Sequence, residues 1–144
     1  MTADAIIKKL DLQPHPEGGY YRQTWIADND GRPTGTCIYF LLKNGESSHW
    51  HRVDAAEFWL WHAGDPLPLS VAATDAGPTH IITLGPDILN DHQSQRVIEP
   101  GAWQAAGPAN GPEGYTLVSC IVAPGFEFSG FHLAAPEWAP GGDK

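Results

Sequence analysis

Most of the chain consists of short apolar runs separated by turn residues, which is the pattern of β-strands. From Tyr20 onward the runs are rich in aromatic and β-branched side chains, and Gly, Pro, Asn and Asp interrupt them. Turn signals such as Lys43-Asn44-Gly45 and Glu99-Pro100-Gly101 mark the breaks. The predicted strands are Tyr20–Trp25, Thr36–Lys43, His49–Val53, Glu57–His62, Leu67–Ala73, His80–Leu84, Arg96–Ile98, Trp103–Ala106, Tyr115–Ala123 and Phe131–Leu133. Many short strands at close spacing are typical of a β-sandwich or a β-barrel.

Only the start of the chain follows a helical period. Ile6, Ile7 and Leu10 fall on one helical face, and Thr2 is a suitable N-cap. We therefore expect a short amphipathic helix within residues 1–12 and an all-β sandwich or barrel over residues 13–135. Residues 136–144 include two prolines and two glycines and are expected to form a flexible tail. At 144 residues, the chain has the usual size of a single domain.

Composition and charge narrow the classes of partner. The chain has 16 glycines and 13 prolines, too many for a helix bundle. Eight basic residues against 17 acidic ones give a net charge of −9, without a Lys/Arg cluster, so we expect no nucleic-acid partner. No apolar stretch is long enough to cross a bilayer, and no secretory leader pattern opens the chain. We therefore expect a cytoplasmic protein that has no membrane partner and binds a small molecule.

The stretch from Gly45 to Gly64 carries the strongest candidates for chemistry. Residues two apart in a strand point to the same side, so His49 and His51 are predicted to aim at one point, which Glu57 reaches from the next strand. Two histidines and one carboxylate hold a divalent transition metal while leaving coordination positions open. The alternative is a cluster of polar side chains that hydrogen-bond one another without a metal.

Aromatic and basic side chains near this stretch are candidate ligand contacts. Trp59 and Trp61 share the strand parity of Glu57, and Trp103 adds a third indole; these rings form either an aromatic wall for a sugar-like ligand or part of the core. Tyr20 and Arg22 share one strand face and are expected to reach over the pocket or toward a subunit interface.

Several motifs resemble those of the cupin superfamily. Gly45, His49, His51, Glu57 and Gly64 resemble its first motif, although the gap between His51 and Glu57 is longer than usual. The stretch Val97–Gln104 resembles its second motif, in which a metal-ligand histidine follows a Pro-Gly turn; here that position holds Gln104. The segment Pro14–Arg22, the sequence Trp103-Gln104-Ala105-Ala106 and the stretch Thr116–Phe128 are similar to the cupin group called domain of unknown function 985.

This resemblance implies a double-stranded β-helix, also called a jelly-roll barrel, with a pocket in its mouth and a homodimeric assembly. It implies His49, His51, Glu57 and Gln104 as ligands of Fe, Mn, Ni or Zn, and a metal-free barrel is the alternative. The leading functional hypothesis is binding of a small polar molecule, possibly sugar-like, with isomerisation, epimerisation or lysis. The metal would polarise a substrate oxygen, and without a metal His51 or Glu57 would be the general base. The competing hypotheses are an Fe(II)-dependent oxygenase and a non-catalytic binding or storage-like cupin.

Overall fold

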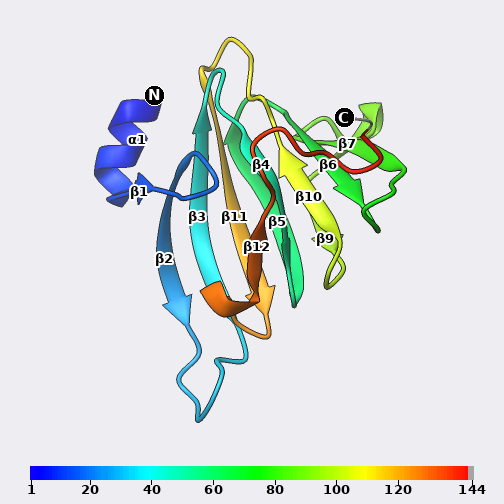
Figure 1. The fold of residues 1–144 in the computed structure, drawn as a ribbon. Coiled ribbons are helices and arrows are strands. Elements are labelled where there is room, and N and C mark those ends of the chain that lie inside the picture. The colour runs from blue at the N-terminus through cyan, green and yellow to red at the C-terminus, as the bar shows by residue number, and fades with distance from the viewer. Residues whose placement is uncertain (143–144) are drawn as a thin grey trace.

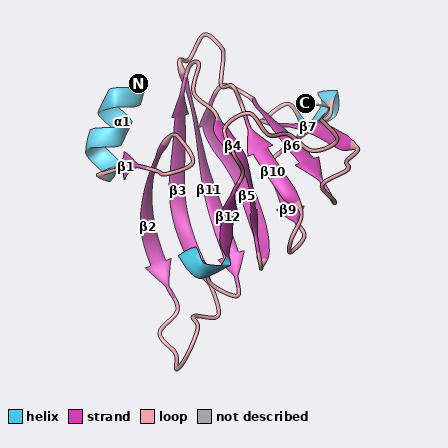
Figure 2. Cartoon of the chain, viewed as in Figure 1, coloured by secondary structure: helices cyan, strands magenta, loops and turns pink. Residues whose placement is uncertain are grey.

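Two β-sheets of six strands each form most of the molecule, as a computed structural model describes it for residues 1–142 (Figure 1). The first sheet has the order β1-β2-β3-β11-β5-β9: Gln13–Pro14, Tyr20–Ile26, Thr36–Lys43, Tyr115–Ala123, Ala56–Gly64 and Gln95–Ile98. The second has the order β12-β4-β10-β6-β7-β8: Phe131–Leu133, Ser48–Val53, Trp103–Ala106, Leu67–Ala72, Thr79–Leu84 and His92–Gln93. Helical structure is confined to α1 at Ala3–Leu10 and two short 3₁₀ turns, η1 at Ile88–Asn90 and η2 at Phe128–Gly130 (Figure 2).

The structure confirms the all-β fold with a short N-terminal helix. Every predicted strand is present, with ends that agree to within two residues. The strands β1 and β8 were not predicted, because a segment of two residues is too short to show a period. None of the helices among residues 1–142 is long and apolar enough to span a membrane.

The helix α1 covers the outer face of the first sheet. The Thr2 side chain accepts a hydrogen bond from the Ala5 amide at 3.2 Å, so the predicted N-cap is confirmed. Ile6 is buried and packs with Leu12, Leu41 and Tyr115. Helix and sheet are thus held together by a second apolar cluster outside the barrel.

The main core fills the space between the sheets. It is built by inward-facing side chains of both sheets, including Phe40, Trp59, Leu67, Leu69 and Val118, all of which are almost fully buried. Burial of one such side chain stabilises the fold by about 1.5–3 kcal/mol. Of these residues, Phe40 also lines the cavity described below.

The chain beyond the last strand lies against the second sheet. The Trp138 ring packs on the Trp103 ring with their centroids 4.4 Å apart, and the Gly141 amide donates to the carbonyl of Asp75 at 2.7 Å. Residues 136–142 of the expected tail make these contacts, whereas residues 143–144 lie outside the described residues. The flexibility of this tail stays a prediction.

The connection between β1 and β2 crosses to the second sheet and docks on β4. The carbonyl of Glu17 accepts a hydrogen bond from the His49 amide at 3.0 Å. Gly18 follows with φ of +107°, and a Cβ at this position would overlap the carbonyl oxygen of Ser47. The close approach therefore requires glycine for both its backbone angle and its missing side chain.

We expect Gly18→Ala to lower the free energy of unfolding more than Gly31→Ala does. Gly31 also has a positive φ, of +75°, but a Cβ there would meet no atom within 4 Å, so its substitution costs only the backbone strain of about 1–2 kcal/mol. Gly18→Ala adds the displacement of the connection from β4. Urea unfolding of the two variants measures the difference, and equal losses would contradict the docking role of Gly18.

Candidate functional site

A cavity of about 250 Å³ lies inside the barrel, between strands of both sheets and the segment 126–131. Its apolar walls include Ile38, Phe40 and Val122 together with Phe126, Phe128 and Phe131, and Phe128 is 59% exposed. Its titratable side chains are His15, Glu17, Tyr21, His51, Glu57 and Cys120. No lysine or arginine of the described chain lines it. The site is thus an apolar pocket with a small group of acidic and imidazole side chains.

Glu17 reaches this group from the connection that Gly18 docks on β4. Its carboxyl group accepts a hydrogen bond from the Ser48 hydroxyl at 2.6 Å and lies 3.3 Å from Nε2 of His51. Burial raises the pKa of Glu17 to about 8, and the Ser48 hydrogen bond offsets part of this rise. Glu17 is therefore mainly a neutral carboxylic acid at pH 7.

The backbone fixes the tautomer of His51. Its Nδ1 lies 2.7 Å from the carbonyl oxygen of His49, which only accepts hydrogen bonds, so Nδ1 carries a hydrogen. Burial lowers the pKa of His51, which is only 1% exposed. The neutral ring then presents the lone pair of Nε2 to the Glu17 carboxyl group. The Glu17 carboxyl group and the unprotonated Nε2 of His51 therefore face each other at 3.3 Å.

Glu57 is held by a chain of two hydrogen bonds through the core. The Trp59 indole donates to Oε1 of Gln104 at 2.7 Å, and Nε2 of Gln104 donates to Oε1 of Glu57 at 3.0 Å. Because an indole N–H only donates, this contact fixes the amide of Gln104 with its oxygen toward Trp59. Burial raises the pKa of Glu57 to about 7, against the lowering effect of the His51 charge. Both forms of this carboxyl group are therefore populated near neutral pH.

His15 completes the polar group from the same connection as Glu17. Its ring lies edge-on to Tyr21 at 4.5 Å and to Phe40 at 5.7 Å, and Nδ1 accepts a hydrogen bond from the Glu17 amide at 3.1 Å. Burial and the nearby His51 lower its pKa to about 4. His15 is thus a neutral ring at pH 7 and adds no positive charge to the cavity.

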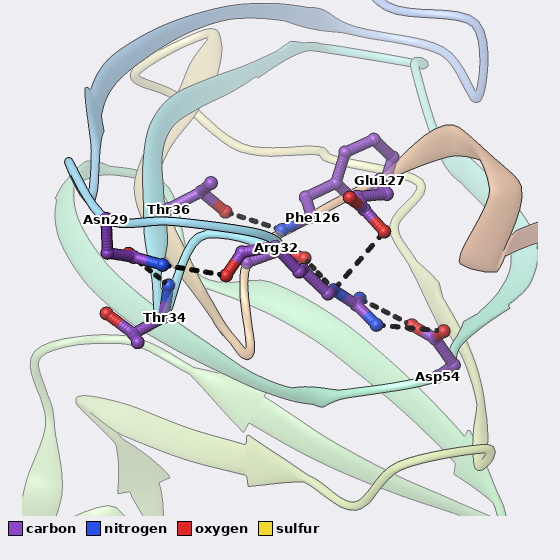
Figure 3. Close-up of polar contacts among 8 residues, drawn as sticks. Asn29, Arg32, Thr34, Thr36, Asp54, Phe126 and Glu127 are labelled. Carbon is purple, nitrogen blue, oxygen red and sulfur yellow. Dashed lines mark hydrogen bonds and ion pairs between the residues drawn. The ribbon is translucent and has the colours of Figure 1, made fainter.

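Phe126, Phe128 and Phe131 form one wall of the cavity, called the phenylalanine wall below. A polar network outside the barrel holds the backbone of this wall at Phe126 (Figure 3). The Arg32 guanidinium donates to both oxygens of Asp54, at 2.7 and 3.1 Å, and to the carbonyl of Gly125 at 2.8 Å, and it lies 3.5 Å from Glu127. The Phe126 amide donates to the Thr36 hydroxyl at 3.0 Å. These contacts hold the backbone on both sides of Phe126 against two other loops.

His49 does not join His51 in the cavity. In the pairing of β4 with β10, His51 lies opposite Gln104 and Ser48 lies opposite Ala106. Three steps along β4 thus match two steps along β10, so β4 carries one extra residue, a β-bulge. The bulge breaks the two-residue alternation, and Ser48 and His51 are both fully buried although they are three residues apart. Nε2 of His49 instead lies 2.8 Å from the carbonyl oxygen of Ala135.

The five predicted ligand contacts lie outside the cavity lining. On β2, Tyr20 packs in the cluster beneath α1 and Arg22 donates to the carbonyl of Leu10, while their neighbours Tyr21 and Gln23 line the cavity. The three indoles lie elsewhere. The Trp59 indole donates to Gln104, the Trp61 indole to the carbonyl of Asp65, and the Trp103 indole to the Asp75 carboxylate. A ligand-binding role for these five side chains stays a prediction.

Sequence reasoning missed Glu17 and His15 as site residues. Both belong to the Pro14–Arg22 segment that resembles the cupin group, but they precede the first predicted strand, so strand alternation gives neither side chain a direction. The signal was the Gly-Gly pair itself, since Gly18 allows the close approach that delivers Glu17 to His51. Phe126 and Phe128, expected in the core, line the cavity.

The four predicted metal ligands do not fit a common ion in this arrangement. Nε2 of His49 is hydrogen-bonded to the carbonyl of Ala135, and neither His49 nor Gln104, whose Oε1 accepts from the Trp59 indole, lines the cavity. Among residues 1–142, no group of three or more His, Cys, Asp or Glu side chains has the geometry of a metal site. His51 and Glu57 alone of the predicted set line the cavity.

We expect the free energy of unfolding to fall as the pH rises from 6.5 to 8.5. Unfolded glutamates ionise near pH 4.5, whereas Glu57 and Glu17 keep their protons in the folded state up to about pH 7 and 8, so alkali favours unfolding. The slope is up to about 1.4 kcal/mol per pH unit for each carboxyl group still protonated in the folded state. The lowered pKa of His15 and His51 acts in the opposite direction only below about pH 6.5.

Urea unfolding at pH 6.5, 7.5 and 8.5 measures this slope. Glu17→Gln should flatten it, because the amide carries no proton to lose, whereas Glu99→Gln at an exposed turn should leave it unchanged. A slope that Glu17→Gln does not alter would contradict the raised pKa of Glu17.

We expect Arg32→Ala to loosen the phenylalanine wall. Loss of the contacts to Asp54 and Gly125 should speed hydrogen exchange of the Phe126 amide by about fivefold, as for the loss of a partly exposed ion pair. Arg52→Ala is the matched control, because Arg52 lies over the Trp103 ring, away from the cavity lining. Unchanged protection of Phe126 in Arg32→Ala would show that other contacts hold the wall.

Comparison with solved structures finds close relatives over nearly the whole chain. A hypothetical protein from Leishmania major is 35% identical, with a TM-score of 0.85, and the match covers 94% of this chain and 88% of that one. A protein from Shewanella oneidensis is 36% identical, with a TM-score of 0.86, and the match covers 94% and 85%. A search of curated proteins found no match.

More distant structures share the fold alone. Oxalate decarboxylase from Bacillus subtilis is 15% identical, with a TM-score of 0.64, over 86% of this chain and 30% of that one. Another of its structures names Mn(II) centres in that enzyme. The family model described as Cupin superfamily (DUF985) matches residues 4–134. The predicted cupin barrel is therefore confirmed, and the chain belongs to the DUF985 family of the cupin superfamily.

Proposed function

We propose that this cupin binds a small molecule in its barrel cavity and moves a proton on it, in an isomerase, epimerase or lyase type of reaction. One observation carries the proposal: Glu17, His51 and Glu57 lie together in a Phe-lined cavity, without a lysine or arginine to neutralise them. Such groups are expensive to bury, and perturbed carboxyl groups in a cavity are typical of functional sites.

Glu57 is the proposed general base. Its pKa of about 7 gives it a sizeable ionised fraction at neutral pH and keeps it basic enough to accept a proton. The hydrogen bond from Gln104, itself fixed by Trp59, orients the carboxyl group so that it does not have to be ordered when the ligand arrives. Gln104 is thus a positioning residue in this proposal.

The Glu17–His51 pair is the proposed partner acid. The Glu17 carboxyl group carries a proton at pH 7, because burial raises its pKa to about 8, and it lies 3.3 Å from the neutral ring of His51. As Glu57 takes a proton from a substrate carbon, Glu17 can donate its proton toward negative charge that develops on a neighbouring substrate oxygen. Ser48 fixes the far oxygen of Glu17, so the pair keeps its orientation.

The remaining sequence-based hypotheses stay predictions. A metal held by the four predicted ligands would require His49 to turn from the carbonyl of Ala135 toward the cavity. A sugar-like ligand was expected on indole rings, whereas the rings that line the cavity are those of phenylalanine, tyrosine and histidine. We propose instead a ligand with one polar end and an apolar body. Oxygenase chemistry, a purely binding role and a homodimer also stay predictions.

The proposed reaction predicts exchange of carbon-bound hydrogen with solvent. Hydroxyacetone, acetoin and phenylacetone are incubated with the protein in D₂O, and deuterium uptake beside the carbonyl is followed by ¹H NMR. Glu57→Gln should slow uptake by about 100-fold or more, as expected for the loss of a general base. Glu99→Gln should leave the rate unchanged, because Glu99 lies in an exposed turn. Equal rates for wild type and Glu57→Gln would contradict the role of Glu57.

A further inference from the structure

Glu57 has more capacity to accept hydrogen bonds than the protein fills. Glu57 is only 7% exposed and lines the cavity. Within residues 1–142, the Gln104 amide and the weak Cys120 thiol are its hydrogen-bond donors, whereas an ionised carboxylate offers about four acceptor sites. Burying a carboxylate with so few partners is costly, and a positive charge in the cavity would compensate for it.

The chain itself supplies no such positive charge. Among residues 1–142, the titratable groups that line the cavity with Glu57 are His15 and Glu17 from the β1–β2 connection, Tyr21 from β2, His51 from β4 and Cys120 from β11. Burial lowers the pKa of both histidines, so they are neutral at pH 7. Arg32 is paired with Asp54 and Glu127 and is not among the lining residues.

The walls opposite this charge are aromatic faces and edges. Phe126 stands perpendicular to Phe128, at 85° and 4.9 Å between centroids, and Phe128 stands perpendicular to Phe131, at 88° and 6.0 Å. Phe131 also lies 5.6 Å from the ring of His51, which links the phenyl wall to the polar group. Rings set at right angles can surround a compact cation, and their negatively polarised faces attract it without hydrogen bonds.

From this juxtaposition we infer that the cavity takes a small organic cation, an alkylated ammonium group held between the phenylalanine wall and Glu57. The volume of about 250 Å³ equals about eight water molecules at ~30 Å³ each, which is enough for a compact ammonium compound. The inference rests on the proposed function in placing the ligand in this cavity. It adds the ligand class and does not require proton transfer.

Calorimetry with two ligands of equal shape tests the charge. Choline has a positively charged quaternary nitrogen where 3,3-dimethylbutan-1-ol has a neutral quaternary carbon. The two ligands are otherwise matched in size and in their hydroxyl group. At pH 8 we expect choline to bind about tenfold more tightly, the gain expected for a cation against aromatic rings and one carboxylate. Equal or tighter binding of the neutral alcohol, or no binding of choline, overturns the inference.

The variant Glu57→Gln separates charge from shape. It should abolish the preference for choline while the affinity for the neutral alcohol, which also reports an intact fold, stays within about twofold of wild type. A choline preference that survives in Glu57→Gln overturns the role of Glu57. Lowering the pH from 8 to 6 should weaken choline binding and leave the alcohol unaffected, because the pKa of Glu57 is about 7.

The outcomes also distinguish this inference from the proposed reaction. Binding of the neutral alcohol without choline binding refutes the cation but keeps a small-molecule cavity. Choline binding without any deuterium uptake in the exchange experiment supports the cation and argues against proton transfer. Phe131→Leu should reduce the choline preference about threefold or more, since it removes a ring face but keeps an apolar wall.

Discussion

Two carboxyl groups and an imidazole are buried together in this barrel, and no lysine or arginine of residues 1–142 lines their cavity. Removing such groups from water favours their neutral forms, so near pH 7 Glu17 is mainly protonated, Glu57 is partly protonated and His51 is neutral. The hydrogen bonds around them follow from this constraint. Ser48 and the carbonyl of His49 orient Glu17 and His51, and the Trp59–Gln104 pair orients Glu57.

The site is assembled by both sheets and by a connection that belongs to neither. Glu57 comes from the first sheet, His51 from the second, and Glu17 from the segment between β1 and β2. Gly18 makes this possible, because a side chain there would collide with the carbonyl of Ser47. The Arg32 network similarly fixes the phenylalanine wall from outside the barrel. The cavity thus depends on contacts between segments that are far apart in the sequence.

Membership of the DUF985 family explains the barrel but not its chemistry. The position where the cupin motif expects a histidine holds Gln104, and the structure uses this amide as a bridge between Trp59 and Glu57. The bulge in β4 turns His49 away from His51. Of the four predicted metal ligands, His51 and Glu57 are thus the two that line the cavity.

The strands, the capped helix and the barrel class can be predicted from the sequence, because alternation of apolar residues and turn signals are local properties. It also identified His51, Glu57 and Gln104 as members of one neighbourhood. The positions of the other residues depend on long-range packing. His49 and the three predicted indoles lie outside the cavity lining, whereas Glu17 and the phenylalanine wall line the cavity. A single bulge reverses strand parity, and a long-range approach such as that of Gly18 to Ser47 leaves no periodic signal in the sequence.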